Sequence, residues 1–201
     1  MRSRLVSVAT DMFYKEGFSA VGVQAIVDAA RTTKPTLYRY FASKDELGAE
    51  CVSRIASDYI EELAAISAQY SDNSILELQS IVDHAAKYID DPAFRGWPLS
   101  NAEAEISDPD HPIRRVCRRY NIQVRAHLQE VARRAAVPQP ESLADGLMLL
   151  IEGAAVSWRS FGANGPAASL TVHSRALINA FANETSMADV AGSGGQARQL
   201  R

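Results

Sequence analysis

Residues 23–41, VQAIVDAARTTKPTLYRYF, decide the fold predicted for this chain. The apolar side chains of residues 23–30 recur at helical spacing, and Leu37 and Phe41 mark a second short helical segment. Residues 31–33 join the two segments. Two short helices joined by such a turn are typical of a helix-turn-helix, whose second helix enters the major groove of DNA.

The second helix of this pair carries many hydrogen-bonding side chains for its length. Pro35 lies in its first turn, where the missing N–H costs nothing. A helix of two turns that served only packing would rarely place so many polar groups on its outer face, which favours a role in binding DNA. These polar residues are Lys34, Thr36, Tyr38, Arg39 and Tyr40.

Residues 43–46, Ser-Lys-Asp-Glu, form a capping box that predicts the start of another helix. Lys44 lies in its first turn, where a cation opposes the helix dipole. A phosphate bound there by the backbone N–H groups and the Lys44 ammonium would remove this cost. A solvated lysine that is merely tolerated at the helix start is the alternative.

Helical periodicity continues along the rest of the chain, and no alternating strand pattern occurs in the sequence. We therefore predict an all-α fold of about nine helices, with an N-terminal three-helix head in residues 1–47 and a helical body in residues 48–185. Residues 186–201 are rich in Gly, Ala, Ser and Gln, and we predict that they are disordered.

Charge is distributed unevenly. Residues 1–47 hold seven Lys and Arg against five Asp and Glu, a net charge of +2, whereas the remainder holds fourteen against nineteen, a net charge of −5. A mildly basic head is consistent with DNA contact. No apolar run approaches the roughly 18 residues of a membrane span, and Asp11 interrupts the basic N-terminus before a signal peptide can form. A cytoplasmic protein without membrane contact is expected.

The sequence offers no constellation for catalysis, metal binding or cofactor binding. Cys51 and Cys117 lie on the apolar stripes of their helices, so we predict inert core thiols in place of redox sensors. The four histidines lack metal-ligand spacing, and neither a Ser-His-Asp order nor a glycine-rich phosphate loop occurs. We expect a protein that is not an enzyme and has no cofactor.

Residues 5–47, LVSVATDMFYKEGFSAVGVQAIVDAARTTKPTLYRYFASKDEL, are similar to the N-terminal domain of the TetR family of regulators. The matching features are the MFYKEGF end of the first helix, the TLYRYF core and the SKDEL start of the fourth helix. The resemblance implies a three-helix DNA-binding head, a long fourth helix that links head and body, and a helical body for ligand binding and dimerisation.

The resemblance also implies roles for single positions. Lys34, Pro35 and Thr36 match residues that face bases, and Tyr38 and Lys44 match residues that touch phosphates. The full set predicted to contact double-stranded DNA is Gln24, Thr33, Lys34, Pro35, Thr36, Tyr38, Arg39, Tyr40 and Lys44.

Two positions depart from the family pattern. Gly22 replaces the Ser or Thr that often begins the second helix, so no side chain there can contact the DNA backbone. Arg31 replaces the usual turn glycine, so the turn must accept a Cβ at some cost in strain.

In the predicted body, residues 96–105, GWPLSNAEAE, resemble a GCPxxNAxxE segment of one large group of the family, with Trp in place of the cysteine. Aromatic and amide side chains of the body either line an effector pocket or pack in the core, because both are built from the same residue types. The pocket candidates are Tyr88, Trp97, Asn101, Tyr120 and Trp158.

Two further surfaces of the body invite a prediction. The helices expected at residues 141–161 and 167–183 carry more apolar surface than one chain buries, so we predict that they pair with their copies in an intermolecular four-helix bundle. Four arginines form either a second nucleic-acid surface or, as we favour, a solvated face paired with nearby acids. These are Arg114, Arg115, Arg118 and Arg119.

The predicted function is that of a homodimeric DNA-binding transcription regulator. We expect a repressor that is released from a palindromic operator by an unknown small-molecule effector. The alternatives are a helical enzyme that has acquired a similar segment, and a regulator without a small-molecule input. Activation also stays open, because its sign depends on the position of the operator.

Overall fold

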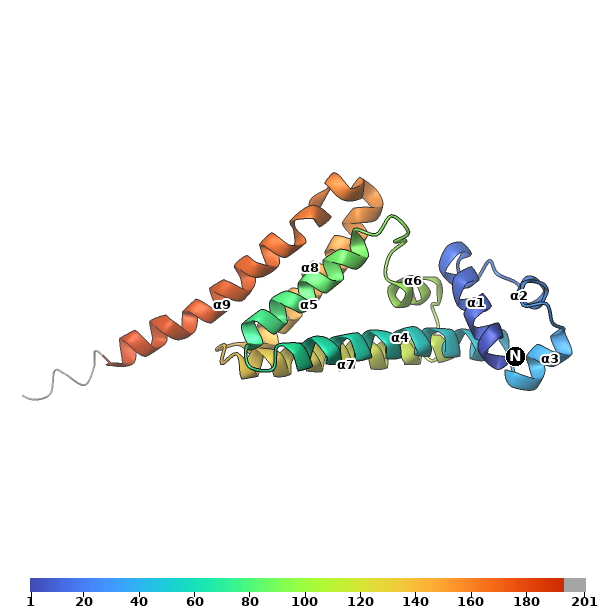
Figure 1. Ribbon diagram of the computed structural model, residues 1–201, viewed down its shortest axis with the longest axis horizontal. Helices are drawn as coiled ribbons and strands as arrows, with labels where there is room; N and C mark the ends of the chain where they lie inside the picture. Colours follow the sequence, from blue (N-terminus) through green and yellow to red (C-terminus); the bar gives the residue numbers. More distant parts are fainter. Residues whose placement is uncertain (194–201) are drawn as a thin grey trace, which may run out of the picture. The chain divides into compact units, whose positions relative to one another are not determined.

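The computed structural model describes the backbone of residues 1–193 and the side chains of residues 1–183. Over this part the protein is all-α, with nine α-helices and no strand, which confirms the predicted fold class (Figure 1). The helices are α1 (Arg2–Glu16), α2 (Val23–Ala29), α3 (Lys34–Tyr40), α4 (Lys44–Gln69), α5 (Ser74–Ile89), α6 (Pro98–Glu105), α7 (Pro112–Arg134), α8 (Pro140–Phe161) and α9 (Leu170–Ser193), with the 3-10 helices η1 (Gly162–Asn164) and η2 (Pro166–Ser169) between α8 and α9.

Several helix boundaries lie where the sequence carries a capping residue. Asn73 begins α5 with its side-chain oxygen accepting the N–H of Leu76 at 3.0 Å. Gly17 ends α1 with φ +93°, and Gly162 ends α8 with φ +67°. Positive φ is tolerated best by glycine, so both positions fix where their helix stops.

The chain divides into two compact units. The first unit contains Met1–Glu62 and Arg95–Ile122, and the second contains Leu63–Phe94 and the chain from Gln123 onward. Helices α4 and α7 each contribute residues to both units. The compact units therefore divide the chain differently from the predicted boundary after residue 47, which stays a prediction about function.

The first unit has two apolar clusters. One fills the interior of the three-helix head and includes the start of α4. Its buried members are Leu5, Val6, Ala9, Val21, Ile26, Val27, Ala30, Leu37, Phe41, Leu47 and Cys51. The other joins the end of α1 and the middle of α4 to the segment around α6 and α7. Its buried members are Phe18, Val52, Ala56, Leu99, Ile106, Ile113, Val116 and Cys117.

Gly48 of α4 allows a close approach inside this second cluster. A Cβ added there would lie 2.6 Å from an atom of the Phe18 ring and 2.7 Å from an atom of Ile113. Because α4 has no side chain at this point, Phe18 and Ile113 both reach its backbone.

In the second unit, α5, α8 and α9 pack against one another (Figure 1). Their facing side chains are apolar and buried, as the helical stripes predicted. Examples are Leu78, Ile81, Val82 and Ile89 of α5, Leu143 and Leu147 of α8, and Ile178 of α9. No helix in the described residues is both long and apolar enough to cross a membrane.

The C-terminal end of α9 differs from the prediction. The helix extends to Ser193, so residues 186–193 have helical backbone where disorder was expected. Met187 and Ala188 are good helix formers, and they continue the preceding helix before Gly and Ser become frequent. Residues 194–201, the remainder of the predicted disordered tail, lie outside the described residues.

Candidate nucleic-acid interface

Helices α2 and α3 form the predicted helix-turn-helix. Gly22 begins α2 without a side-chain cap, as its identity required. Thr33 begins α3, where its hydroxyl oxygen accepts the N–H of Thr36 at 3.4 Å and lies 3.0 Å from the Thr36 hydroxyl. The capping role orients Thr33 toward α3, so its oxygen is already in use at the start of that helix.

Arg31 adopts the left-handed conformation expected from its place in the turn. Its φ is +49°, where a side chain with a Cβ costs about 1–2 kcal/mol. The turn is secured by backbone hydrogen bonds from Arg31 N to Asp28 O at 3.0 Å and from Thr32 N to Val27 O at 2.8 Å. The helix-turn-helix thus accepts a strained residue where glycine would fit without strain.

Helix α3 separates its buried and exposed faces clearly. Leu37 is fully buried, and Phe41 just after the helix is nearly so. On the opposite face Tyr38 is 49% exposed, and Lys34, Pro35 and Arg39 are also exposed, whereas Thr36 and Tyr40 are half-buried. The polar residues predicted to face DNA are therefore largely on the solvent side of α3.

Some of the predicted contact residues already bond to neighbours. Gln24 Nε2 donates to Asp28 Oδ1 at 2.8 Å, one turn further along α2. The Arg39 guanidinium lies 5.2 Å from the centre of the Tyr40 ring. DNA binding through Gln24 or Arg39 would exchange these contacts for contacts with bases or phosphates.

The start of α4 confirms the N-cap in the predicted capping box. The Ser43 hydroxyl accepts the N–H of Glu46 at 3.0 Å, and the Glu46 carboxylate accepts the N–H of Ala42 instead of that of Ser43. The Lys44 ammonium lies 4.4 Å from the centre of the Phe18 ring, at cation–π distance. Lys44 therefore packs against Phe18 at the N-terminus of α4 while it is still partly exposed, and its contact with a phosphate stays a prediction.

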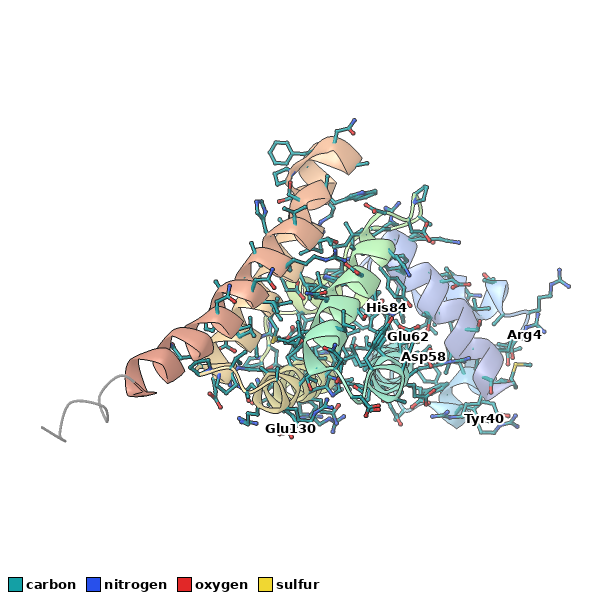
Figure 2. The ribbon with its side chains drawn as sticks, turned by 60° about the vertical axis from the view of Figure 1, so that its left-hand side comes forward. Arg4, Tyr40, Asp58, Glu62, His84 and Glu130 are labelled. Carbon is teal, nitrogen blue, oxygen red and sulfur yellow. The ribbon has the colours of Figure 1, made fainter. Side chains whose placement is uncertain are left out.

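Arg4 of α1 is a cation of the head that the sequence prediction did not include. It is exposed and extends away from α1, whereas Tyr40 belongs to the neighbouring helix α3 (Figure 2). Arg2 differs, because it pairs with Glu50 at 2.7 Å, and this hydrogen bond raises the pKa of Arg2. The sequence could have identified Arg4 as an exposed cation, because it lies outside the apolar stripe of α1.

Three of the predicted pocket residues belong to the first unit. The Tyr59 ring lies 6.1 Å from both the Trp97 ring and the Tyr120 ring, so these aromatics form a packed cluster. Asn101 donates from Nδ2 to the carbonyl oxygen of Arg95 at 3.0 Å. A cavity of about 40 Å³ between α1, α4 and α6 includes Asn101, but not Trp97 or Tyr120, in its lining.

The other two pocket candidates belong to the second unit. Tyr88 meets His84 edge-on with ring centres 5.2 Å apart, and Trp158 meets Phe94 in the same way at 5.5 Å. Both side chains are half-buried. Such ring packing is expected if Tyr88 and Trp158 are core residues. Their role in lining an effector pocket therefore stays a prediction.

The arginines at the start of α7 bond mainly to backbone oxygens. Arg114, Arg115 and Arg118 donate to carbonyl groups in residues 103–110. The Nε atom of Arg114 also lies 3.8 Å from the Glu103 carboxylate, and Arg119 is exposed. Carbonyl groups of the preceding residues are thus acceptors for these arginines beside the acid of Glu103, and the solvated face stays a prediction.

The two cysteines are core residues, as predicted. Cys51 donates to the carbonyl oxygen of Val6 and Cys117 to that of Leu99, both at 3.6 Å. Burial raises the pKa of Cys51 to about 11 and that of Cys117 to about 12. Both thiols stay protonated near neutral pH, so neither has the reactivity of a redox sensor.

The head, from α1 to the start of α4, matches a known family. Residues 5–51 match the model of the bacterial regulatory proteins of the tetR family. The head is thus that of a TetR-family regulator by its sequence. The match covers the helix-turn-helix and the Lys44 position, so the family assignment rests on the residues of the candidate interface.

Two relatives are similar to the chain over stretches longer than the head. The chain is 28% identical over 107 residues to the HTH-type transcriptional repressor DhaR of Mycobacterium sp. (strain GP1), covering 53% of this chain and 52% of DhaR. It is 26% identical over 118 residues to the uncharacterized HTH-type transcriptional regulator YxaF of Bacillus subtilis (strain 168), covering 58% and 61%. The chain thus spans little more than half the length of these relatives.

Similarity in fold extends over most of the chain. The TetR-family regulator SCO4454 of Streptomyces coelicolor aligns with a TM-score of 0.80 at 24% identity, covering 91% of this chain and 94% of that one. A putative TetR regulator (sav143) of Streptomyces avermitilis aligns with a TM-score of 0.71 at 25% identity, covering 90% and 97%. The family match of the head and the named regulators DhaR and YxaF favour a regulator over a helical enzyme.

Proposed function

We propose that this TetR-family protein is a DNA-binding transcription regulator, a repressor that leaves a near-palindromic operator when a small-molecule effector binds. The observation that carries the proposal is the exposed face of α3, where Lys34, Tyr38 and Arg39 are on the solvent side while Leu37 is buried. A helix with such a face fits the major groove of B-DNA. The repressor reading is supported by the name of DhaR.

In this proposal the residues divide by what they touch. Lys34, Pro35 and Thr36 at the start of α3 face the base edges, because the N-terminal residues of a recognition helix reach deepest into the groove. Tyr38 and Lys44 contact phosphates. The N-terminus of α4 supports a phosphate site, since its backbone N–H groups and the Lys44 ammonium lie at the same end of the helix. Gln24, Thr33, Arg39 and Tyr40 complete the contact surface.

The second copy that supplies a second head is proposed to bind α8 and α9. Leu149 and Val156 of α8 are 74% and 54% exposed, and Val172 of α9 is 67% exposed. Gly153 lies between the two α8 residues, and a Cβ there would meet no atom within 4 Å. Nothing within one chain requires glycine at this exposed helical position, whereas close approach of a partner helix would.

A dimer of this kind presents two heads to successive major grooves about 34–36 Å apart, or a multiple of that distance. Such a regulator works in the cytoplasm, where it meets DNA. The proposed effector site lies in the body, and Tyr88 and Trp158 of the second unit are its candidate lining. The competing function is a regulator without an effector.

The DNA proposal is tested by the salt dependence of duplex binding. Lys44→Ala should weaken binding and flatten the plot of log affinity against log salt, by about 0.9 for each phosphate that the protein no longer neutralises. A dimer has one such phosphate at each head. Lys87→Ala is the charge-matched control, because Lys87 is exposed on α5 in the other unit. Equal slopes for both variants and the unchanged protein would reject the phosphate role of Lys44.

The dimer proposal is tested by sedimentation at micromolar concentration. Leu149→Arg should produce monomers, because it places a charge on the proposed interface. Ile122→Arg makes the same change at an exposed apolar residue of α7 and should leave the dimer intact. A monomeric unchanged protein would remove the two-headed mechanism.

The effector proposal is tested by screening small apolar compounds for release of bound DNA. A regulator without an effector would release its DNA in response to none of them.

A further inference from the structure

The segment around α6 is tied to the loop that leads into the helix-turn-helix. Glu105, the last residue of α6, accepts the N–H of Phe18 on Oε1 at 3.1 Å and the N–H of Ser19 on Oε2 at 2.8 Å. Gly17 precedes these residues with φ +93°, and a Cβ there would lie 3.0 Å from Glu105 Oε1. One carboxylate thus satisfies two backbone donors just before α2, at a point where the loop fits closely around it.

A second tie joins the other end of the segment to α1. The Tyr14 hydroxyl accepts the N–H of Arg95 at 2.7 Å and donates to the carbonyl oxygen of Gly96 at 3.3 Å. The same turn is held by Asn101, whose Nδ2 donates to the carbonyl oxygen of Arg95. Residues 95–105 are therefore bound to α1 and its following loop at both ends.

Helix α7 holds the same segment from the other side. Arg114 donates to the carbonyl oxygens of Glu103 at 3.2 Å and Ile106 at 3.1 Å, which include the C-terminal end of α6. Arg115 and Arg118 donate to carbonyl oxygens in residues 109–110. Because α7 contributes residues to both compact units, it is continuous from this segment into the second unit.

The contact between α1 and α6 is not filled by apolar packing alone. The cavity of about 40 Å³ lies between them, with Tyr14, Phe18 and Glu105 in its lining, and its volume suffices for a few water molecules. A contact that contains space can adjust, so the hydrogen bonds of Tyr14 and Glu105 have a larger part in fixing its geometry than they would in a close-packed core.

We propose that Glu105 and Tyr14 are positioning residues for DNA recognition. They fix the orientation of the helix-turn-helix on residues 95–105, and Arg114 of α7 fixes the C-terminal end of that segment in turn. A displacement of α7 then changes the orientation of the head through these two side chains. This inference rests on the proposed DNA-binding function. It gives a second connection through which a displacement in the body changes the orientation of the head, besides the covalent connection through α4.

The test compares the affinity of the full-length protein for duplexes whose two half-sites have the selected spacing or a spacing one base pair longer or shorter. Glu105→Gln leaves one oxygen to serve two N–H groups, and Tyr14→Phe removes only the hydroxyl. Both should reduce the preference for the selected spacing, by about fivefold or more if the coupling is of ordinary size. Glu16→Gln removes the same charge from an exposed position at the end of α1 and should keep the preference.

The spacing preference distinguishes positioning from a general loss of folded protein. A variant that only lowers the folded fraction weakens binding to all spacings equally, and an unchanged preference in both variants would overturn the proposal. Amide hydrogen exchange gives a second readout that needs no DNA: Phe18 and Ser19 should exchange faster in Glu105→Gln, and Arg95 in Tyr14→Phe. If exchange is faster in the variants but the protein binds no duplex, the proposed function is refuted. If exchange is unchanged, the hydrogen bonds of Glu105 and Tyr14 to these backbone groups are refuted.

Discussion

Glu77 of α5 is a fully buried carboxylate, and its removal should destabilise the protein far more than removal of an exposed carboxylate with a similar partner. Within the second unit Glu77 accepts hydrogen bonds from the Ser67 hydroxyl at 2.5 Å and from Arg134 Nη2 at 2.7 and 2.8 Å. The Glu77 side chain is 0% exposed and that of Arg134 is 37% exposed. Arg133 and Glu141 also meet at 2.7 Å, but with 47% and 53% exposure.

The difference in burial sets the expected magnitudes. Breaking a buried ion pair costs about 3–5 kcal/mol, because the remaining charge is left without a partner. Arg134 can be hydrated through its exposed part, so we expect Glu77→Ala to lower the free energy of unfolding by about 3 kcal/mol. For a chain of this length that corresponds to about 6–12 °C in the melting temperature. Glu141→Ala should leave the melting temperature nearly unchanged, because water screens the exposed pair.

Thermal and urea unfolding of the full-length variants measure this difference. All variants need the same protein concentration, because the stability of a dimer depends on it. Ser67→Ala should give an intermediate loss, since it removes one donor and keeps the Arg134 pair. Melting temperatures of Glu77→Ala and Glu141→Ala that agree within about 2 °C would refute the reasoning, because burial would then make no difference to the strength of the pair.

Three further predictions concern the turn, a histidine and the thiols. Arg31→Gly should raise the free energy of unfolding by about 1 kcal/mol, because it relieves a positive φ, whereas Ala29→Gly in the neighbouring helix should lower it by about the same amount; urea unfolding checks both, and a loss for Arg31→Gly would contradict the strain. Burial lowers the pKa of His127 below 6.5, so its contribution to stability is present above pH 6.5 and is lost as the pH falls through the folded pKa; His127→Gln should make the loss of stability on acidification shallower, and an unchanged pH profile would argue against it. Cys51 and Cys117, with pKa values of about 11 and 12, should resist a thiol reagent at pH 8 in the folded protein and react after unfolding; rapid labelling of the native protein would show that the thiols are accessible.

The sequence was most informative where the helical spacing of apolar residues shows both which side chains are buried and which are exposed for binding. In α3 the spacing of Leu37 and Phe41 identified the buried face, and the remaining polar residues then had to lie outward. The same held for the start of α4, where Ser43 was recognised as a cap. The positive φ of Arg31 was also foreseeable, because the residue stands at a turn position that favours glycine.

What the sequence could not supply were contacts between residues far apart in the chain. Glu105 bonds to Phe18 and Ser19, more than eighty residues earlier, and nothing local distinguishes it from a solvated acid. Nothing local marks Glu77 in the first turn of α5 as buried either, since an acid is favourable at that position on a surface helix. Its burial becomes tolerable only because Arg134 and Ser67 reach it in the folded unit.

The backbone partners of the α7 arginines could not be predicted for a related reason. A sequence shows which acids are available as partners, but it does not show which backbone carbonyls a turn leaves exposed. Arg115 and Arg118 bond to carbonyls of the loop before α7, and so serve the fold more than a charged surface.

The central claim is that the exposed face of α3 reads DNA, and selection of bound sequences from a random duplex library tests it most directly. The account predicts a near-palindrome with one preferred half-site spacing. It also predicts that Lys34→Ala relaxes the preference at one position in each half-site, whereas Lys44→Ala weakens all sequences alike. Recovery of no enriched sequence, together with no binding at low salt, would contradict the account and leave the head without a role in reading DNA.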